Sequence, residues 1–287
     1  MPIKIIVTHP GSAHKDDFLA CCLLAHLHRV PIQRRDPTAE DLADPDICVV
    51  DVGGSHDPAL QNFDHHHFPR DHAPLCALSL VLQSIDLYDD AKQFCSWLGP
   101  AEWLDTRGPM ATAREMGIPP SAFNALLSPI DITLLRRFAV QTQHAVDDPL
   151  YQVMEMIGDD LVGYLRSLRG RLDDLKNRCD YWTISSDSRT IQAIFLERTD
   201  PVDEDPSFGL EQFVASECPD QEIVAMVYPD RRGSGYGLTR YRDNKLVDFS
   251  RIEACEDVRF AHKRGFVAKT DATDPSRLKE LLAKAIV

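Results

Sequence analysis

Residues 3–17 read IKIIVTHPGSAHKDD, a stretch that predicts the first strand, loop and helix of an α/β fold. The β-branched run from Ile3 to Thr8 favours a strand, because such side chains suit a pleated, buried surface. Pro10 and Gly11 then end the strand. The mostly apolar residues 16–30 are long enough for a helix, and acidic residues in its first turn favour a helix start.

The alternation of strand and helix continues beyond this stretch. Residues 32–34 and 47–51 predict two further strands, with a short helix between them at 38–42. No tight hairpin joins these strands, which favours a parallel sheet with helices on its faces. The middle of the chain is then predicted to be helical, at residues 76–87, 89–98, 120–127 and 132–168, the last broken near Pro149.

The composition changes after Asn177. Short apolar runs separated by Pro, Asp and Gly are typical of antiparallel strands, and they occur at residues 181–185, 191–196, 222–228 and 236–241. A helix over residues 278–286 closes the chain. We therefore predict two domains: residues 1–178, a parallel-sheet α/β domain with a helical middle, and residues 179–287, a smaller α+β domain.

The overall composition indicates a folded protein, with 44% hydrophobic and 26% charged residues. A net charge of −14 argues against a broad basic surface for nonspecific duplex binding. A site that binds divalent cations would also make the sequence look acidic, because its carboxylates are counted and the bound ions are not. The eight cysteines form no C-x-x-C pair and are expected to be reduced. Without a signal peptide or a membrane-spanning run, we expect a cytoplasmic protein with no membrane partner.

The histidines are concentrated near the N-terminus, where nine of the eleven lie within the first 72 residues. His9 follows the first predicted strand, and Asp51 ends another. The carboxyl ends of parallel strands meet at one edge of the sheet, where ligands bind in such folds. We therefore expect these side chains to lie together with His14 and Asp16 and with the carboxylate and imidazoles of residues 63–68, FDHHHF.

Imidazole and carboxylate ligands without thiolates favour Mn²⁺, Mg²⁺, Fe²⁺ or Zn²⁺ over soft metals. Several carboxylates allow two ions to be bridged. A pair of ions about 3.5–4 Å apart would activate a shared water and stabilise both the attacking and the leaving oxygen of a phosphoryl displacement. The residues thus outline a phosphoesterase site.

Three motifs, in this order and spacing, resemble the DHH phosphoesterase superfamily: THPGSAHKDD at residues 8–17, VDVGGSHDP at 50–58 and FDHH at 63–66. The most similar branch is that of melanocyte proliferating gene one, also labelled "metal-dependent protein hydrolase". Weaker similarity at residues 227–230 and 260–266 extends into the C-terminal half. The resemblance implies a two-domain hydrolase that uses two Mn²⁺-like ions.

The resemblance also implies a role for each motif residue. His9 and His14 would bind one metal ion, Asp16 and His65 the other, and Asp51 would bridge both. The superfamily's fourth motif supplies one more aspartate, for which Asp105 is the best match. Asp64 would orient a ligating imidazole, and His66 would reach the scissile phosphate or the leaving oxygen as a catalytic group.

The C-terminal half departs from the branch. A Gly-Gly-His usually follows the C-terminal Gly-Phe, whereas residues 265–270 here read GFVAKT. The substrate contact is therefore altered, either lost or passed to Lys269. Lys263 and Arg264, beside this motif, are further candidates for substrate binding, because point charges there would offset phosphate charge without a globally basic surface.

The leading functional hypothesis is a two-metal phosphodiesterase that hydrolyses single-stranded RNA or short oligonucleotides, by resemblance as a 3'-to-5' exonuclease. Relatives in the superfamily also include pyrophosphatases and cyclic-dinucleotide phosphodiesterases. The altered C-terminal motif therefore keeps a second enzyme hypothesis open, hydrolysis of a small phosphate compound such as pyrophosphate or a nucleotide. A third alternative is a metal-binding scaffold without catalytic activity.

Overall fold

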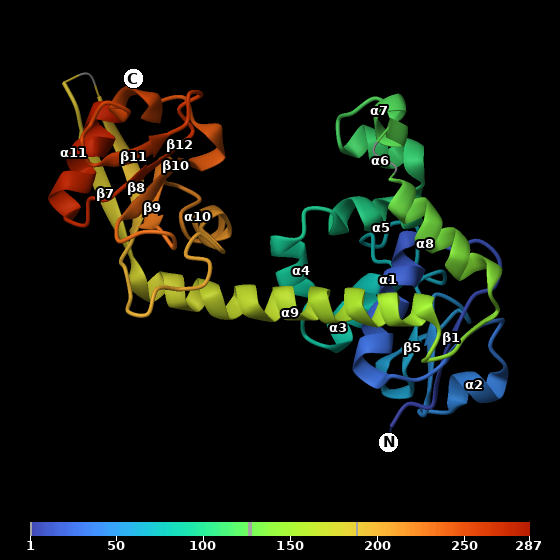
Figure 1. Ribbon diagram of the computed structural model, residues 1–287. Helices are drawn as coiled ribbons and strands as arrows, with labels where there is room; N and C mark the ends of the chain where they lie inside the picture. The colour runs from blue at the N-terminus through green and yellow to red at the C-terminus, as the bar shows by residue number, and fades with distance from the viewer. Residues whose placement is uncertain (1, 126–127, 188) are drawn as a thin grey trace. The chain divides into compact units, whose positions relative to one another are not determined.

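The computed structural model describes residues 2–125, 128–187 and 189–287. The chain divides into two compact units, Met1–Arg166 and Ser167–Val287. This division falls inside helix α9 (Pro149–Arg178), and the predicted domain boundary at residues 178 and 179 coincides with the end of that helix. Each unit has its own sheet and its own hydrophobic core (Figure 1).

The sheet of the first unit is built around β1 (Ile5–Thr8), which pairs in parallel with β2 (Ile32–Arg34) and β3 (Ile47–Val50). Strand β5 (Asn62–Phe63) extends the parallel part beside β3. The edge strands β4 (His56–Asp57) and β6 (Gln143–His144) are antiparallel, and among the described residues the order is β4-β5-β3-β1-β2-β6. The predicted parallel sheet is thus present, with antiparallel edges.

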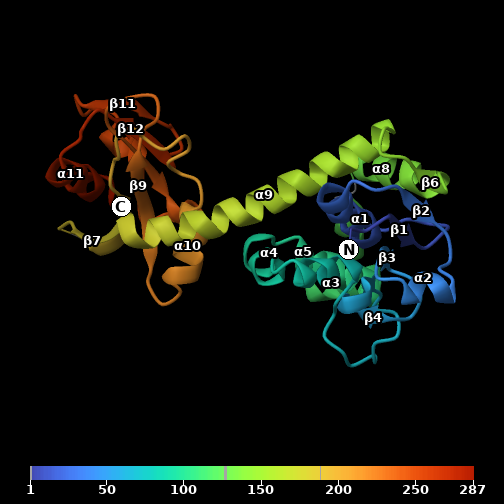
Figure 2. The same cartoon turned by 90° about the horizontal axis from the view of Figure 1, so that it is seen from below.

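Helix α1 (Lys15–His28) lies at the centre of the first core. Its residues 20–25 are buried on every side, and it contacts β1, β3 and α3 (Ala77–Ser84), beside which it lies in Figure 2. The other helices of the unit that the structure describes are α2 (Ala39–Ala43), α4 (Tyr88–Phe94), α5 (Leu98–Arg107), α6 (Pro109–Glu115), α7 (Pro120–Ala125) and α8 (Pro129–Val140). Helices α5 and α6 were not predicted. Residues 126 and 127, at the predicted end of the helix over 120–127, lie outside the described residues.

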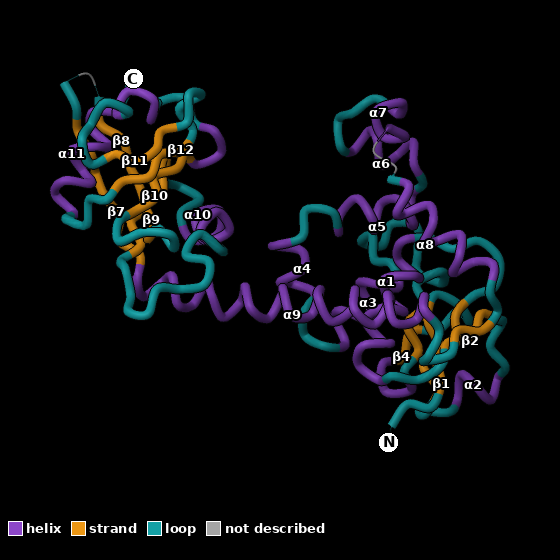
Figure 3. The backbone as a smooth tube through the Cα atoms, in the orientation of Figure 1, coloured by secondary structure: helices purple, strands orange, loops and turns teal. Residues whose placement is uncertain are grey.

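The second unit consists of a mixed sheet and helices. Its hydrophobic core is formed largely by residues of the strands, which are orange in Figure 3. Its described strands are β7 (Cys179–Ser185), β8 (Thr190–Leu196), β9 (Ile223–Pro229), β10 (Tyr236–Arg240), β11 (Val258–Ala261) and β12 (Val267–Thr270), in the order β11-β12-β10-β9-β8-β7. Asp274 caps α11 (Pro275–Ala285) by accepting a hydrogen bond from the Arg277 N–H at 2.9 Å.

One strand pair of this sheet corrects the expectation of an antiparallel arrangement. Strands β8 and β9 are parallel, whereas the neighbouring pairs are antiparallel. Helix α10 (Leu210–Glu217) lies in the connection between them and returns the chain to the same edge, as parallel neighbours require. The expectation failed because the segment that separates the two strands was not recognised as containing a helix.

All eight cysteines are free, and six of them are buried. Among the helices of the described residues, none combines the length and the apolar character that crossing a membrane would need.

Candidate metal centre

The loop after β1 is held by buried charged residues. The Asp17 carboxylate accepts hydrogen bonds from the backbone N–H groups of His14 (2.7 Å) and Phe18 (2.8 Å), which fixes the first turn of α1. From β2, the buried Arg34 donates to the carbonyl oxygens of Gly11 (3.2 Å) and Ser12 (3.0 Å). These bonds order the loop that carries His9 and His14 and the helix start that carries Asp16.

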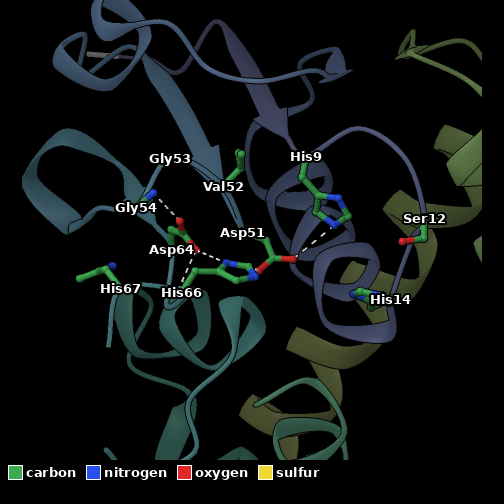
Figure 4. Close-up of a pocket in the computed structure, with 10 residues that line it drawn as sticks. All are labelled: His9, Ser12, His14, Asp51, Val52, Gly53, Gly54, Asp64, His66 and His67. Atoms are coloured by element: carbon green, nitrogen blue, oxygen red, sulfur yellow. Dashed lines mark hydrogen bonds and ion pairs between the residues drawn. The ribbon is translucent and has the colours of Figure 1, made fainter. Parts of the chain in front are cut away.

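Asp51 follows β3 in the left-handed region of backbone space, with φ of 58°. Such a conformation is costly for a residue with a Cβ, and Asp tolerates it better than most. The buried Asp51 side chain lies at the carboxyl edge of the sheet, in the cavity shown in Figure 4. One carboxylate oxygen is 3.4 Å from His9 Nε2, and the other is 3.2 Å from His65 Nε2.

Asp64 organises the segment that carries His65 and His66. It accepts hydrogen bonds from the Gly54 N–H, from the His66 N–H and from His66 Nδ1, the last at 2.6 Å. Burial raises the pKa of Asp64, but these hydrogen bonds outweigh that effect and lower it to about 2. Asp64 is therefore ionised and can only accept, so the proton of His66 stands on Nδ1.

Asp105 reaches the cluster from helix α5. Its carboxylate oxygens lie 2.8 Å from His65 Nε2 and 4.0 Å from His14 Nδ1. Helix α5 is anchored by Glu102, whose buried carboxylate accepts hydrogen bonds from Ser79 (2.7 Å), Tyr88 (2.9 Å) and Lys92 (2.7 Å). The network fixes the helix one turn before Asp105.

Asp16 is the most informative residue of the cluster. Its side chain is buried, and neither of its carboxylate oxygens has a hydrogen-bond partner in the described part of the chain. Burial, followed by repulsion from Asp51 and Asp105, raises the pKa of Asp16 well above its ordinary value. Burial also raises the pKa of Asp51, against the nearby His65 imidazole, which lowers it. A buried carboxylate without a counter-charge is unfavourable, and a bound cation would relieve it.

The potential ligands form two groups in the described residues. Asp51, Asp64, His65 and His66 form one, and His14, Asp16 and Asp105 form the other, with the ligand atoms of each group within 4.8 Å of one another. Oxygen and imidazole donors in this arrangement fit divalent cations such as Mn²⁺ or Mg²⁺. The donor set and the unpaired oxygens of Asp16 both fit the metal ions that the resemblance implies.

The structure brings together all the N-terminal candidates of the sequence analysis, which are His9, His14, Asp16, Asp51, Asp64, His65, His66 and Asp105. One detail differs from the implied pairing. His14 lies in a group with Asp16 and Asp105, although its ring centroid is also 5.9 Å from that of His9. The division of these ligands between two ions remains a prediction.

Two residues around the cluster received no role from the sequence. The buried Asp17 lies 3.2 Å from His9 Nε2, and this contact raises the pKa of His9 against the effect of burial. Arg34 approaches the same carboxylate at 3.6 Å. The available signals were a second aspartate directly after Asp16 and an arginine in a short apolar strand, but each is also common on a protein surface.

The C-terminal candidates lie in the second unit. Lys263 and Arg264 are exposed in the turn between β11 and β12, whereas Lys269 lies on β12. Lys269 Nζ is 3.4 Å from the Asp230 carboxylate and 5.2 Å from the ring centroid of Tyr228. Arg264 and Lys269 line different cavities, and a role for these three residues in substrate binding stays a prediction.

Comparison with known proteins gives one family model, which matches the N-terminal part of the chain, and several relatives that match a short segment. Residues 5–78 match the family model MYG1_exonuc, described as "Uncharacterised protein family (UPF0160)". MYG1 exonuclease of Homo sapiens is 48% identical over 65 residues, which is 21% of this chain and 16% of that protein. MYG1 exonuclease of Mus musculus is 43% identical over 77 residues, 25% of this chain and 20% of that protein.

Two further comparisons reach a more distant protein and a solved structure. MYG1 protein C694.04c of Schizosaccharomyces pombe is 40% identical over 65 residues, 21% of this chain and 19% of that protein. The solved structure "Member of s1p family of ribosomal proteins PF0399 DHH domain" aligns with 98% of this chain and 86% of its own, at 12% identity and a TM-score of 0.35, values too low to carry an inference. The matched segments thus span about a fifth or less of the curated relatives. The sequence matches confirm the predicted resemblance: residues 5–78, which carry His9, Asp51 and His65, are similar to the MYG1-type family.

Proposed function

We propose that this protein is a two-metal-dependent phosphodiesterase that hydrolyses single-stranded RNA or short oligonucleotides as a 3'-to-5' exonuclease. The observation that carries the proposal is the convergence of carboxylates and imidazoles from four separate segments around Asp16, a buried carboxylate with neither oxygen paired in the described residues. The name of the mammalian relatives, MYG1 exonuclease, supports a nucleic-acid substrate. Cleavage direction rests on the family resemblance.

The proposed ligands are His9, His14, Asp16, Asp51, His65 and Asp105. Asp51 suits a bridging role, because its two oxygens face imidazoles from different segments. When bound, divalent ions would lower the pKa of a water molecule and offset charge on the phosphoryl oxygens. Mn²⁺ is the ion we expect, because it accepts both imidazole and carboxylate ligands.

His66 is proposed as the group that donates to the reacting phosphate or to the leaving oxygen. Its side chain is 59% exposed, and it lines the cavity shown in Figure 4. The hydrogen bond with Asp64 raises the pKa of His66, which favours the protonated imidazole near neutral pH. Asp64 holds Nδ1, so Nε2 is the atom left to donate to substrate.

A second candidate function is hydrolysis of a small phosphate compound, such as pyrophosphate or a nucleotide. The observation that favours it is the setting of Lys269, which lies beside Asp230 and Tyr228 instead of the Gly-Gly-His of the branch. A cation already neutralised by a carboxylate contributes less to holding a long polyanionic strand.

The test is hydrolysis of oligoribonucleotides labelled at the 5' or the 3' end, in the presence of Mn²⁺. Pyrophosphate is assayed in parallel as a second substrate under the same conditions. We expect a 5'-labelled strand to shorten progressively from its 3' end. Asp51→Asn should abolish the activity, because an amide cannot carry the charge shared by two cations, whereas the exposed control Asp36→Asn should retain it. Cleavage of pyrophosphate alone would favour the second function, and no hydrolysis of any substrate would refute both.

A further inference from the structure

Two arginines line a second cavity that opens on the candidate metal ligands. This cavity, of about 230 Å³, is lined by Arg70 and Arg107 together with His65, His66 and Asp105. Arg107 is the last residue of α5, two positions after Asp105, and Arg70 lies in the loop that follows the FDHH motif. The second cavity is thus built from the same two segments that supply three groups of the metal centre.

Neither guanidinium is neutralised. Both side chains are exposed, and within the described ranges of the chain neither one forms an ion pair or a hydrogen bond. Some other arginines of the first unit are paired, as Arg29 is with Glu155 (2.9 Å) and Arg35 with Asp41 (2.6 Å), but those do not line this cavity. The chain has 45 acidic and 31 basic residues, so positive charge is scarce. Two unpaired arginines beside the candidate centre can therefore attract an anionic ligand to it.

The two cavities at the centre differ in charge. The larger one, of about 570 Å³, is lined by histidines, aspartates and small residues, and its described lining contains neither lysine nor arginine. His66 lines both cavities, so the proposed donor to the reacting phosphate stands where they meet. A substrate with its reacting phosphate at the metal centre can therefore place a neighbouring phosphate beside the arginines.

We propose that Arg70 and Arg107 bind a second phosphate of the substrate, adjacent to the phosphodiester that reacts. The inference rests on the proposed function and refines it: the favoured substrates are oligonucleotides or dinucleotides with a phosphate on each side of a nucleoside, not isolated phosphodiesters. Guanidinium groups suit this role, because their planar N–H donors match phosphate oxygens in pairs.

A binding experiment isolates this second phosphate. The probes are three ApA dinucleotides whose internal linkage is an uncharged methylphosphonate, which resists hydrolysis. One has no terminal phosphate, one has a 5'-phosphate and one a 3'-phosphate. Their affinities for the full-length protein are measured by calorimetry with Mn²⁺ present. We expect a phosphate at one of the two ends to tighten binding about tenfold or more, the size of a charge-assisted contact.

The variants assign the effect to the arginines. The double variant Arg70→Ala/Arg107→Ala should bind all three probes with equal affinity, while Arg136→Ala, an exposed arginine of α8 outside this cavity, should behave as the wild type. Arg107→Lys should keep part of the preference. Equal binding of the three probes by the wild-type protein, or a preference that persists in the double variant, would overturn the inference.

The binding and hydrolysis experiments distinguish failure of the second phosphate site from failure of the proposed phosphodiesterase function. Hydrolysis of ordinary oligoribonucleotides combined with equal probe affinities would retain the phosphodiesterase and remove the second phosphate site. A terminal-phosphate preference that depends on the arginines, in a protein that hydrolyses nothing, would retain the site and remove the proposed activity.

Discussion

Asp16 shows most directly how the centre differs from an ordinary protein interior. Buried polar groups are nearly always paired, yet both of its oxygens lack partners in the described chain, and Asp51 and Asp105 repel it. Such an arrangement lowers the stability of the metal-free protein. A cation would be the missing partner. Asp16 would then be retained because metal binding needs its charge, even though that charge lowers the stability of the metal-free protein.

Asp16→Asn should therefore stabilise the metal-free protein and destroy its response to metal. In EDTA we expect the free energy of unfolding to rise by about 1–3 kcal/mol, because burying or protonating this carboxylate at neutral pH costs free energy that an uncharged amide avoids. Thermal unfolding with EDTA and with excess Mn²⁺ measures both effects. A variant less stable than the wild type in EDTA, or one that Mn²⁺ still stabilises fully, would contradict this account of Asp16.

His66 separates catalysis from metal binding. If it donates to substrate as proposed, His66→Ala should lower kcat by roughly 100-fold and leave the affinity for Mn²⁺ nearly unchanged. Turnover of an oligoribonucleotide and calorimetric titration with Mn²⁺ provide the two readouts. Since His66 also lies within reach of Asp51, Asp64 and His65, a large loss of Mn²⁺ affinity would instead identify it as a ligand.

At the scale of elements, the close packing of α9 against α1 is set by a glycine. A Cβ added at Gly158 would lie 2.2 Å from the backbone oxygen of Cys22, whereas one added at Gly163, on the same helix, would have nothing within 4 Å. Helix α1 begins with Lys15 and Asp16. The position of the helix that carries Asp16 therefore depends on a contact that only glycine allows.

The two glycines form a matched pair of variants. Gly158→Ala should destabilise the protein by about 1–3 kcal/mol, because the backbones of α9 and α1 must separate. Gly163→Ala should stabilise it slightly, by about 0.5–1 kcal/mol, because alanine favours the helix and meets no neighbour. Denaturant unfolding compares them, and an equal effect of both substitutions would show that the α1–α9 contact is unimportant.

The sequence predicted the elements that have a clear pattern and missed those that do not. The apolar runs of β1 and β3 gave their bounds to within two residues at either end. Helix α5 was missed because Gly99 and Pro100 resemble a turn, although Pro100 stands in the first turn, where its missing N–H costs nothing. Strands β11 and β12 were missed because each has only four residues, too few to show an alternating pattern.

The site was more predictable than the fold around it. His9 and Asp51 were expected together because parallel strands end at one edge of a sheet, and His65 was added from the FDHH segment that resembles the family motif. Asp105 was found through the family resemblance, since its helix was not predicted. The support from Asp17, Arg34 and Glu102 depends on tertiary contacts that no local pattern records.

For the whole molecule, the proposed metal centre lies in the first unit, and bound cations would partly offset the net charge of −14. The central claim is that paired divalent ions occupy the cluster around Asp51. The most direct measurement is anomalous X-ray scattering at the manganese edge from a crystal of the protein soaked in Mn²⁺. We predict two anomalous peaks with Asp51 bound to both, and density without a peak among His9, Asp16, Asp51 and His65 would contradict the account.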